Sequence, residues 1–198
     1  MIVKTPLAIA ATMVFVLCRP PAATAQNFLE ARVADTEYRY VDWNYTFKSG
    51  AVVDAFYVGV PGSNEFNLGG GYVFKRGSLT LTPLLYFVVG KEGSQRGVKA
   101  ALLAAFDKDG WKLLSFVGHY APISGSVGSY QVLDTLDLTR TIGAHWEVGV
   151  QAGFFRAEGA WNTQVGPVVK LNDRLGAWAV SYRFGDEKEF RVGRVLMF

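Results

Sequence analysis

Apolar residues recur at every second position along most of this chain, and this period of two is the feature that most constrains its fold. Between residues 144 and 155, for example, Trp146 and Val150 fall on one face, whereas Glu147 and Gln151 fall on the other. Successive side chains of a β-strand point to opposite faces, so the pattern predicts strands with one apolar face and one polar or small face. Helical spacing is hard to find after residue 35.

Short segments rich in Gly, Ser, Asn, Asp or charge separate these runs at a steady interval and predict turns. The sequence thus predicts strands at 36–47, 51–60, 64–75, 78–90, 96–107, 111–121, 128–138, 144–155, 161–171, 175–184 and 189–198. A closed barrel of bacterial type has an even number of strands, so one more is needed, and 28–34 is the candidate. We expect an all-β fold, an antiparallel transmembrane barrel of about twelve strands with short turns at both ends. Ten strands is the second choice.

Three features interrupt the pattern. Pro83 and Pro167 fall inside predicted strands, where proline removes a hydrogen bond of the ladder and indicates a bulge or an edge. Segment 128–138 alternates poorly, because Asp134 shares a face with apolar neighbours. We expect a bulge or a wrong strand boundary there.

The first 25 residues indicate an export signal. Lys4 gives a positive start, residues 7–18 are apolar, and Ala23-Thr24-Ala25 is a small-x-small cleavage site. The apolar run is too short to span a membrane as a helix. We therefore expect residues 1–25 to be removed and residues 26–198 to form a single barrel domain.

Residues 26–198 are rich in apolar side chains but contain no long apolar stretch. They have no run of 18 apolar residues, although half of the whole sequence is hydrophobic. Spreading apolar residues over alternate positions is typical of barrels in the bacterial outer membrane, where we expect this protein to reside. Without the signal, 18 basic and 17 acidic residues remain. This near balance gives no support for nucleic-acid binding.

Aromatic residues lie near the predicted strand ends, as in the belts that flank the apolar zone of barrels. Trp111, Trp146 and Trp161 are the belt candidates. The last strand ends in Phe198, which resembles the terminal insertion signal of outer-membrane barrels and implies recognition by the barrel-assembly machinery. Arg194 departs from the apolar alternation of that signal, and an arginine near an interface can extend its charged end into water.

The inward-facing residues predict a lumen of mixed charge. Small glycines between them leave space, and barrel diameter grows with strand number. The candidate lumen-lining residues are Asp42, Asn44, Asp54, Glu65, Asn67, Lys99, His145, Glu147, Gln151, Asn162, Gln164, Lys170, Arg183 and Arg191. They favour a porin-like channel for passive passage of small polar solutes, selected by size and charge. If opposite charges pair across the lumen and fill it, the barrel is instead closed and structural.

Other functions have weaker support. A lipid-modifying enzyme needs a nucleophile beside a base, and neither His119 nor His145 has a serine at the required spacing, although Glu147 could orient His145 as a base. We expect no enzyme, no cofactor and no metal site, since there is no suitable cluster of ligands. The short links argue against an adhesin. A soluble lipocalin-like ligand binder also shows period two, but sparse Lys and Glu within the strands argue against it.

Twelve strands with short loops also resemble the small monomeric porins for acidic oligosaccharides. That family lines its pore with tracks of arginine. The inward charges of this chain are balanced, so the substrate of the family does not carry over.

Overall fold

The computed structural model describes residues 27–90, 95–157 and 159–198, with only the backbone of residues 134 and 135. The predicted signal at 1–25 and the expected mature start at Gln26 lie outside the described residues. Thirteen strand segments are present: β1 (Asn27–Ala34), β2 (Arg39–Thr46), β3 (Ala51–Val60), β4 (Ser63–Tyr72), β5 (Phe74–Arg76), β6 (Leu79–Gly90), β7 (Arg96–Lys108), β8 (Trp111–Ser124), β9 (Tyr130–Ile142), β10 (Trp146–Ala157), β11 (Ala160–Asp173), β12 (Gly176–Gly185) and β13 (Glu189–Met197).

The strands form one antiparallel sheet that closes on itself. Each strand pairs with its neighbour in sequence, and β1 pairs with β13 over seven residue pairs from Phe28–Met197 to Ala34–Arg191. Segments β4 and β5 both pair with β6, one after the other, and so occupy a single position in the wall. The barrel therefore has twelve strand positions. The predicted all-β, twelve-stranded fold is confirmed, including the additional strand expected at 28–34.

Both prolines fall where the ladder is interrupted. Pro83 lies opposite the break between β4 and β5, because the β4 pairing ends at Gly71–Leu84 and the β5 pairing begins at Phe74–Leu81. The β11–β12 pairing likewise skips from Val165 to Val168, past Pro167. Proline has no N–H to donate, which explains both gaps.

The expected bulge in β9 is also present. Its pairing shifts register against β8 between Ser115 and Phe116, and against β10 between Ala152 and Phe154. One extra residue in β9 reverses the direction of every side chain that follows. As a result, Asp137 is buried inside the barrel.

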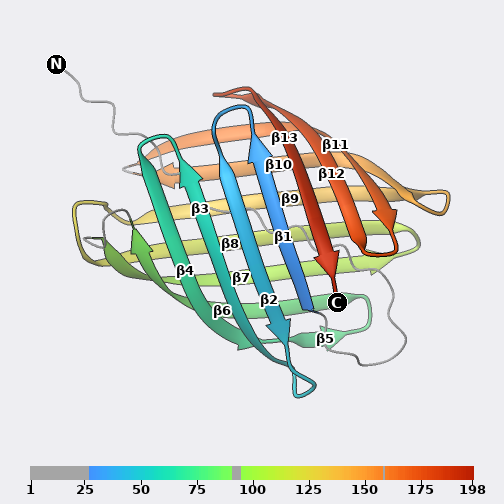
Figure 1. The fold of residues 1–198 in the computed structure, drawn as a ribbon, viewed down its shortest axis with the longest axis horizontal. Coiled ribbons are helices and arrows are strands. Elements are labelled where there is room, and N and C mark those ends of the chain that lie inside the picture. Colours follow the sequence, from blue (N-terminus) through green and yellow to red (C-terminus); the bar gives the residue numbers. More distant parts are fainter. Residues whose placement is uncertain (1–26, 91–94, 158) are drawn as a thin grey trace.

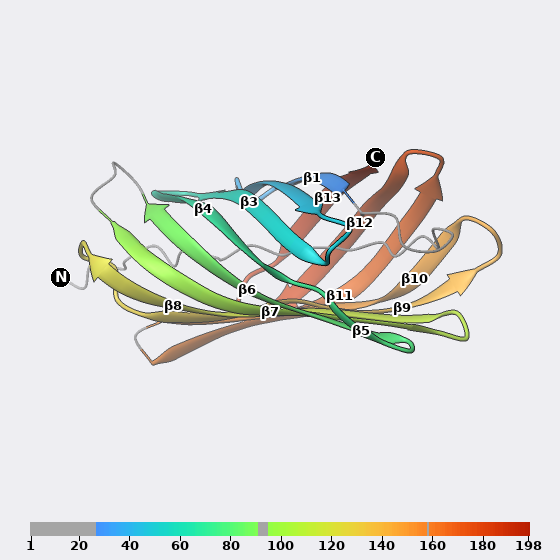
Figure 2. The same ribbon diagram turned by 90° about the horizontal axis from the view of Figure 1, so that it is seen from below.

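The barrel is flattened. In Figure 1, β1–β4, β12 and β13 cross steeply over β6–β9, and Figure 2 shows these two groups as opposing walls. We refer to the end that holds Asn27 and Phe198 as the terminus end and to the opposite end as the loop end. Among the described residues, no helix is long and apolar enough to cross a membrane.

The outer surface is apolar and aromatic. Its exposed large side chains come from nearly every strand and include Leu29, Val33, Val41, Phe66, Leu68, Leu85, Phe87, Leu102, Val117, Leu138, Val150, Val165, Val169 and Val180. Water would oppose such exposure, whereas hydrocarbon favours it, and the closed sheet leaves no unpaired edge in the lipid. This exterior is that of an outer-membrane β-barrel.

The three tryptophans predicted for the belts face outward near strand ends and are 44–57% exposed. The Arg140 guanidinium lies 5.4 Å from the ring of Trp111. Arg194, which departs from the terminal pattern, lies 5.0 Å from the ring of Trp178 and pairs with Asp173 at 2.9 Å. Its charge is thus held at the terminus end instead of in the apolar zone. Recognition of Phe198 by the assembly machinery stays a prediction.

Candidate channel interior

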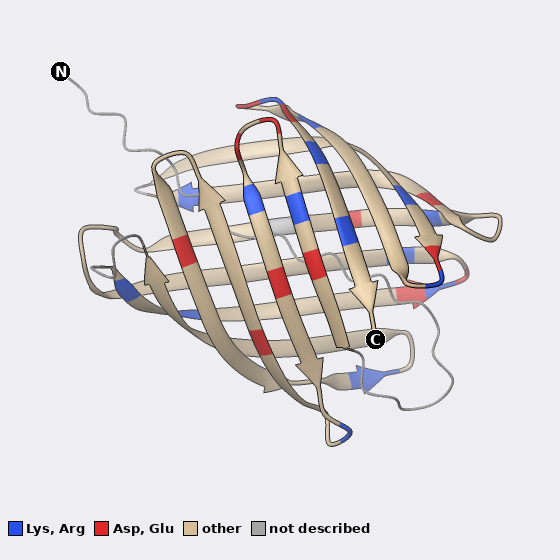
Figure 3. Ribbon diagram, viewed as in Figure 1, with Lys and Arg blue, Asp and Glu red and all other residues tan. Residues whose placement is uncertain are grey.

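The interior has a polar side and an apolar side. Buried polar and charged side chains come mainly from β9–β13 and β1–β4, whereas buried aromatic and aliphatic side chains come mainly from β6–β8 and the loop-end parts of β2, β3, β9 and β10. Figure 3 shows bands of both charge signs crossing β1, β2 and β13. We call the following residues the polar track: Lys112, Asp137, Thr139, Glu147, Gln151, Lys170, Asn172, Ser181, Arg183, Glu189 and Arg191.

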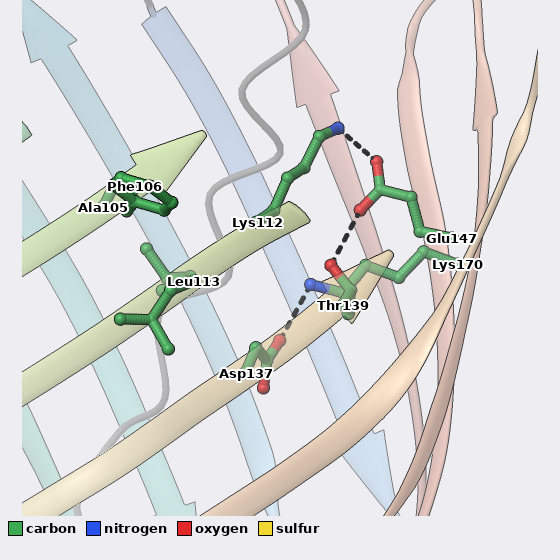
Figure 4. A pocket seen from close by; sticks show the side chains of 9 residues that line it. Ala105, Phe106, Lys112, Leu113, Asp137, Thr139, Glu147 and Lys170 are labelled. Carbon is green, nitrogen blue, oxygen red and sulfur yellow. Dashed lines mark hydrogen bonds and ion pairs between the residues drawn. The ribbon is translucent and has the colours of Figure 1, made fainter. Parts of the chain in front are cut away.

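The track begins in a small pocket at the terminus end (Figure 4). Glu147 is buried there and accepts hydrogen bonds from Lys112 Nζ at 2.5 Å, Asn172 Nδ2 at 2.9 Å and Thr139 Oγ1 at 3.3 Å. These partners come from β8, β11 and β9, so the carboxylate of one strand ties together three others. Charge-assisted hydrogen bonds of this kind offset the cost of burying the carboxylate.

The middle of the track is a chain of hydrogen bonds centred on Asp137. Lys170 Nζ donates to its Oδ2 at 2.8 Å, and Gln151 Nε2 donates to its Oδ1 at 2.8 Å. Ser181 Oγ then donates to Gln151 Oε1 at 3.1 Å. These hydrogen bonds therefore connect β9 and β11 with β12 across β10.

At the loop end the track becomes rich in arginine. Glu189 pairs with Arg183 and, at 2.7 Å, with Arg191, and it accepts a hydrogen bond from Thr36 Oγ1 at 3.0 Å. The Arg191 guanidinium also lies 4.1 Å from the ring centroid of Tyr38. All five side chains project from β12, β13 and the loop between β1 and β2, so this network covers the loop end of the polar side.

One ion pair stands within the apolar side. Lys99 Nζ lies 2.5 Å from Glu65 Oε1, and the hydroxyl of Tyr130 donates to Glu65 Oε2 at 2.5 Å. The same ammonium lies 5.2 Å from the ring of Phe56 and 5.3 Å from that of Tyr130. Lys99 is fully buried, and β6 lies between β4 and β7 in the wall, so this pair bridges over β6.

The side chains pack closely against one another. The largest ones with less than 2% exposure are Arg183, Tyr38, Tyr40, Tyr86, Tyr120, Phe56, Lys99, Phe116, Glu30, Glu147 and Glu189. Bulky charged and aromatic side chains therefore share the interior and are shielded from solvent.

The structure places most of the sequence-predicted lining residues inside the barrel. Those buried are Asp42, Asn44, Asp54, Glu65, Asn67, Lys99, Glu147, Gln151, Gln164, Lys170, Arg183 and Arg191. Asn162 is half-buried near the loop end, and His145 is exposed in the turn between β9 and β10. His145 therefore lies apart from the interior, and Glu147 binds Lys112, Thr139 and Asn172 instead.

Sequence reasoning missed several interior groups. Glu30 and Arg32 form a buried pair at 2.5 Å on β1. Glu189 begins β13 immediately after a charged loop, and Asp137 follows the β9 bulge, so alternation alone assigned neither. Continuing the inward face of β13 back from Arg191 by two residues would have found Glu189.

No family model matches the chain, and no curated protein matches it. Among solved structures, it is similar to the KdgM porin, with 13% sequence identity, a TM-score of 0.64, and coverage of 87% of this chain and 99% of that one. It is also similar to the NanC porin, with 10% identity, a TM-score of 0.60, and coverage of 87% and 99%. At these identities the likeness establishes the fold, which is that of the small outer-membrane porins.

Proposed function

We propose that this protein is an outer-membrane channel for passive passage of small polar solutes and ions along the polar track. The observation that carries the proposal is the succession of three hydrogen-bonded networks along the track. They are centred on Glu147 at the terminus end, on Asp137 in the middle and on Glu189 at the loop end. A solute that loses its water of hydration needs such partners along its whole path.

The geometry favours small solutes. The two sides of the interior pack against each other, so only a narrow path along β9–β13 is available without moving the apolar side. The track carries both signs along its length: Glu147 pairs with Lys112, Asp137 pairs with Lys170, and Glu189 pairs with two arginines at the loop end. Both signs of charge thus line the path, and we expect weak selectivity between cations and anions. One solved relative by fold is described as the KdgM porin in complex with disordered oligogalacturonate. An oligosaccharide chain does not suit this packed interior.

A second candidate is a closed barrel that serves envelope structure. The observation in its favour is the near-complete burial of Lys99, Tyr120 and other large interior side chains, which is more typical of a filled barrel than of a wide pore.

Single-channel recording separates the two candidates. Mature protein, refolded and inserted in a planar bilayer, should give stable conductance steps if the track conducts. Glu189→Gln leaves the two arginines beside it without their carboxylate, so the reversal potential in a salt gradient should shift toward anion selectivity. Glu187→Gln is the matched control, because Glu187 is exposed in the adjacent loop and should leave the reversal potential unchanged. Folded, inserted protein without conductance would favour the closed barrel.

A further inference from the structure

Every hairpin at the terminus end carries an exposed basic residue. These residues, which we call the basic ring, are Lys48 between β2 and β3, Arg76 at the end of β5, Lys108 at the end of β7, Arg140 near the end of β9 and Arg174 between β11 and β12. None of the five forms an ion pair with a described residue. Figure 3 shows basic segments in the β2–β3 hairpin and in β5.

Acidic side chains at the same end do not neutralise the ring. Glu147 is held by Lys112, and Asp173 is held by Arg194. Of the described acids at this end, Asp107 and Asp109 remain, and Lys75 is a further exposed cation. The terminus end therefore has a clear excess of positive charge.

The loop end is balanced instead. Its exposed charges among the described residues are four acids and four bases, namely Asp35, Glu37, Asp186 and Glu187 with Arg39, Arg96, Arg156 and Lys188. The excess of positive charge is thus a property of one end and not of the whole barrel.

Four of the five tryptophans lie at the same end as the basic ring. Trp111 and Trp146 begin β8 and β10, Trp178 is the third residue of β12, and Trp43 pairs with Leu29 near the start of β1. All four face outward and are 40–50% exposed. Tryptophan favours the membrane–water interface, at the level of the head groups. The tryptophans therefore place the basic ring at the height of the lipid head groups.

Trp111 stands between two members of the ring. Lys108 on β7 and Arg140 on β9 are its direct partners in the strand pairing, and directly paired residues point to the same face of a sheet. The Arg140 guanidinium lies 5.4 Å from the Trp111 ring, which holds it against the outer surface. Two cationic donors thus flank one interfacial aromatic ring, about 10 Å apart across two strand spacings.

We propose that the basic ring binds the head groups of anionic phospholipids around the terminus end, with Lys108, Trp111 and Arg140 as a defined site for one head group. Lysine and arginine close to a membrane surface attract anionic lipids, and a guanidinium can bind a phosphate through two hydrogen bonds. The ring residues lie on separate hairpins around the perimeter. Single charges spaced in this way match many small head groups, each with one phosphate, better than one acidic protein. The site is on the outer surface and does not depend on whether the barrel conducts.

Quenching of tryptophan fluorescence by brominated lipids tests the proposal, because four tryptophans lie beside the ring. Mature protein is refolded into vesicles of equal parts phosphatidylglycerol and phosphatidylcholine, with bromine on the acyl chains of one lipid or of the other. The quenching should show a preference for phosphatidylglycerol of about two- to fivefold at low salt. The preference should disappear in about 1 M salt, where the Debye length is about 3 Å.

Two variants remove the same charge from opposite ends of the barrel. The ring variant combines Lys48→Gln, Lys108→Gln, Arg140→Gln and Arg174→Gln, and the matched control combines Arg39→Gln, Arg96→Gln, Arg156→Gln and Lys188→Gln. The ring variant should lose the preference for phosphatidylglycerol, whereas the control should keep it. Both variants have the same net charge, so a difference between them reports where the charges lie.

A milder variant guards against failure of the ring variant to insert. Lys108→Gln/Arg140→Gln changes two exposed side chains and should lower the preference in part. The proposal is overturned if the unmodified protein shows no preference for phosphatidylglycerol at low salt. It is also overturned if the loop-end control loses as much of the preference as the ring variant does.

Discussion

Lys170 Nζ lies 2.8 Å from Asp137 Oδ2, although β10 separates their strands and 33 positions separate them in sequence. The side chains reach each other over the inner face of β10, where Gly149 presents no side chain. The pair therefore clamps three strands in the middle of the polar track, and both groups are at most 3% exposed.

Lys170→Met should destabilise the barrel strongly. The substitution keeps an unbranched apolar stem without the terminal ammonium, and it leaves Asp137 buried with Gln151 as its remaining partner among the described residues. Breaking a buried pair by removing one partner costs about 3–5 kcal/mol. Urea unfolding of the refolded protein, followed by tryptophan fluorescence, measures the loss. Lys188→Met, in an exposed loop, is the control and should change stability little.

Removing the Asp137 carboxylate as well tests whether the lost stability returns. Lys170→Met/Asp137→Leu replaces the pair by apolar groups and should recover much of the lost stability, because no uncompensated charge remains. If Lys170→Met alone is as stable as the unmodified protein, the pair contributes nothing to the clamp.

The close approach of β9 and β10 at Gly149 predicts that adding a side chain there lowers the stability of the barrel. A Cβ at this position would lie 2.0 Å from the carbonyl oxygen of Leu138, a backbone atom that cannot turn aside. Gly149→Ala should therefore push β9 and β10 apart and lower stability by about 1–3 kcal/mol. Gly128→Ala, where a Cβ has open space, is the matched control. Equal stability of the two variants in urea would contradict this geometry.

Alternation in the sequence was sufficient for the strands and for most of the interior. Glu147, Gln151 and Lys170 could be assigned because strict period two links each position to one face. Alternation failed for His145, because this residue precedes β10 and lies in a turn, where alternation no longer determines the direction of a side chain. It also failed for Asp137, because the bulge in β9 shifts the count by one residue.

The apolar side of the interior could not be predicted either. In β6, Leu84, Tyr86 and Val88 are buried inside, while Leu85 and Phe87 face outward. Both faces of this strand are apolar, so composition cannot distinguish lumen from lipid. Closure of the barrel determines which face of β6 points into the interior, and the sequence of β6 alone does not contain that information.

Cysteine labelling at two adjacent positions tests the orientation of β10 and the state of the interior together. Val150 is 49% exposed on the outer surface and Gln151 is 3% exposed inside. The only cysteine, Cys18, falls in the predicted signal, so a mature chain carries no background thiol. In vesicles, Val150→Cys should react with a lipid-soluble maleimide and resist a membrane-impermeant one. Gln151→Cys should react slowly with the impermeant reagent if a narrow aqueous track reaches it, and not at all if the barrel is closed. Faster reaction of Val150→Cys than of Gln151→Cys with the impermeant reagent would contradict the assignment of lipid and lumen faces.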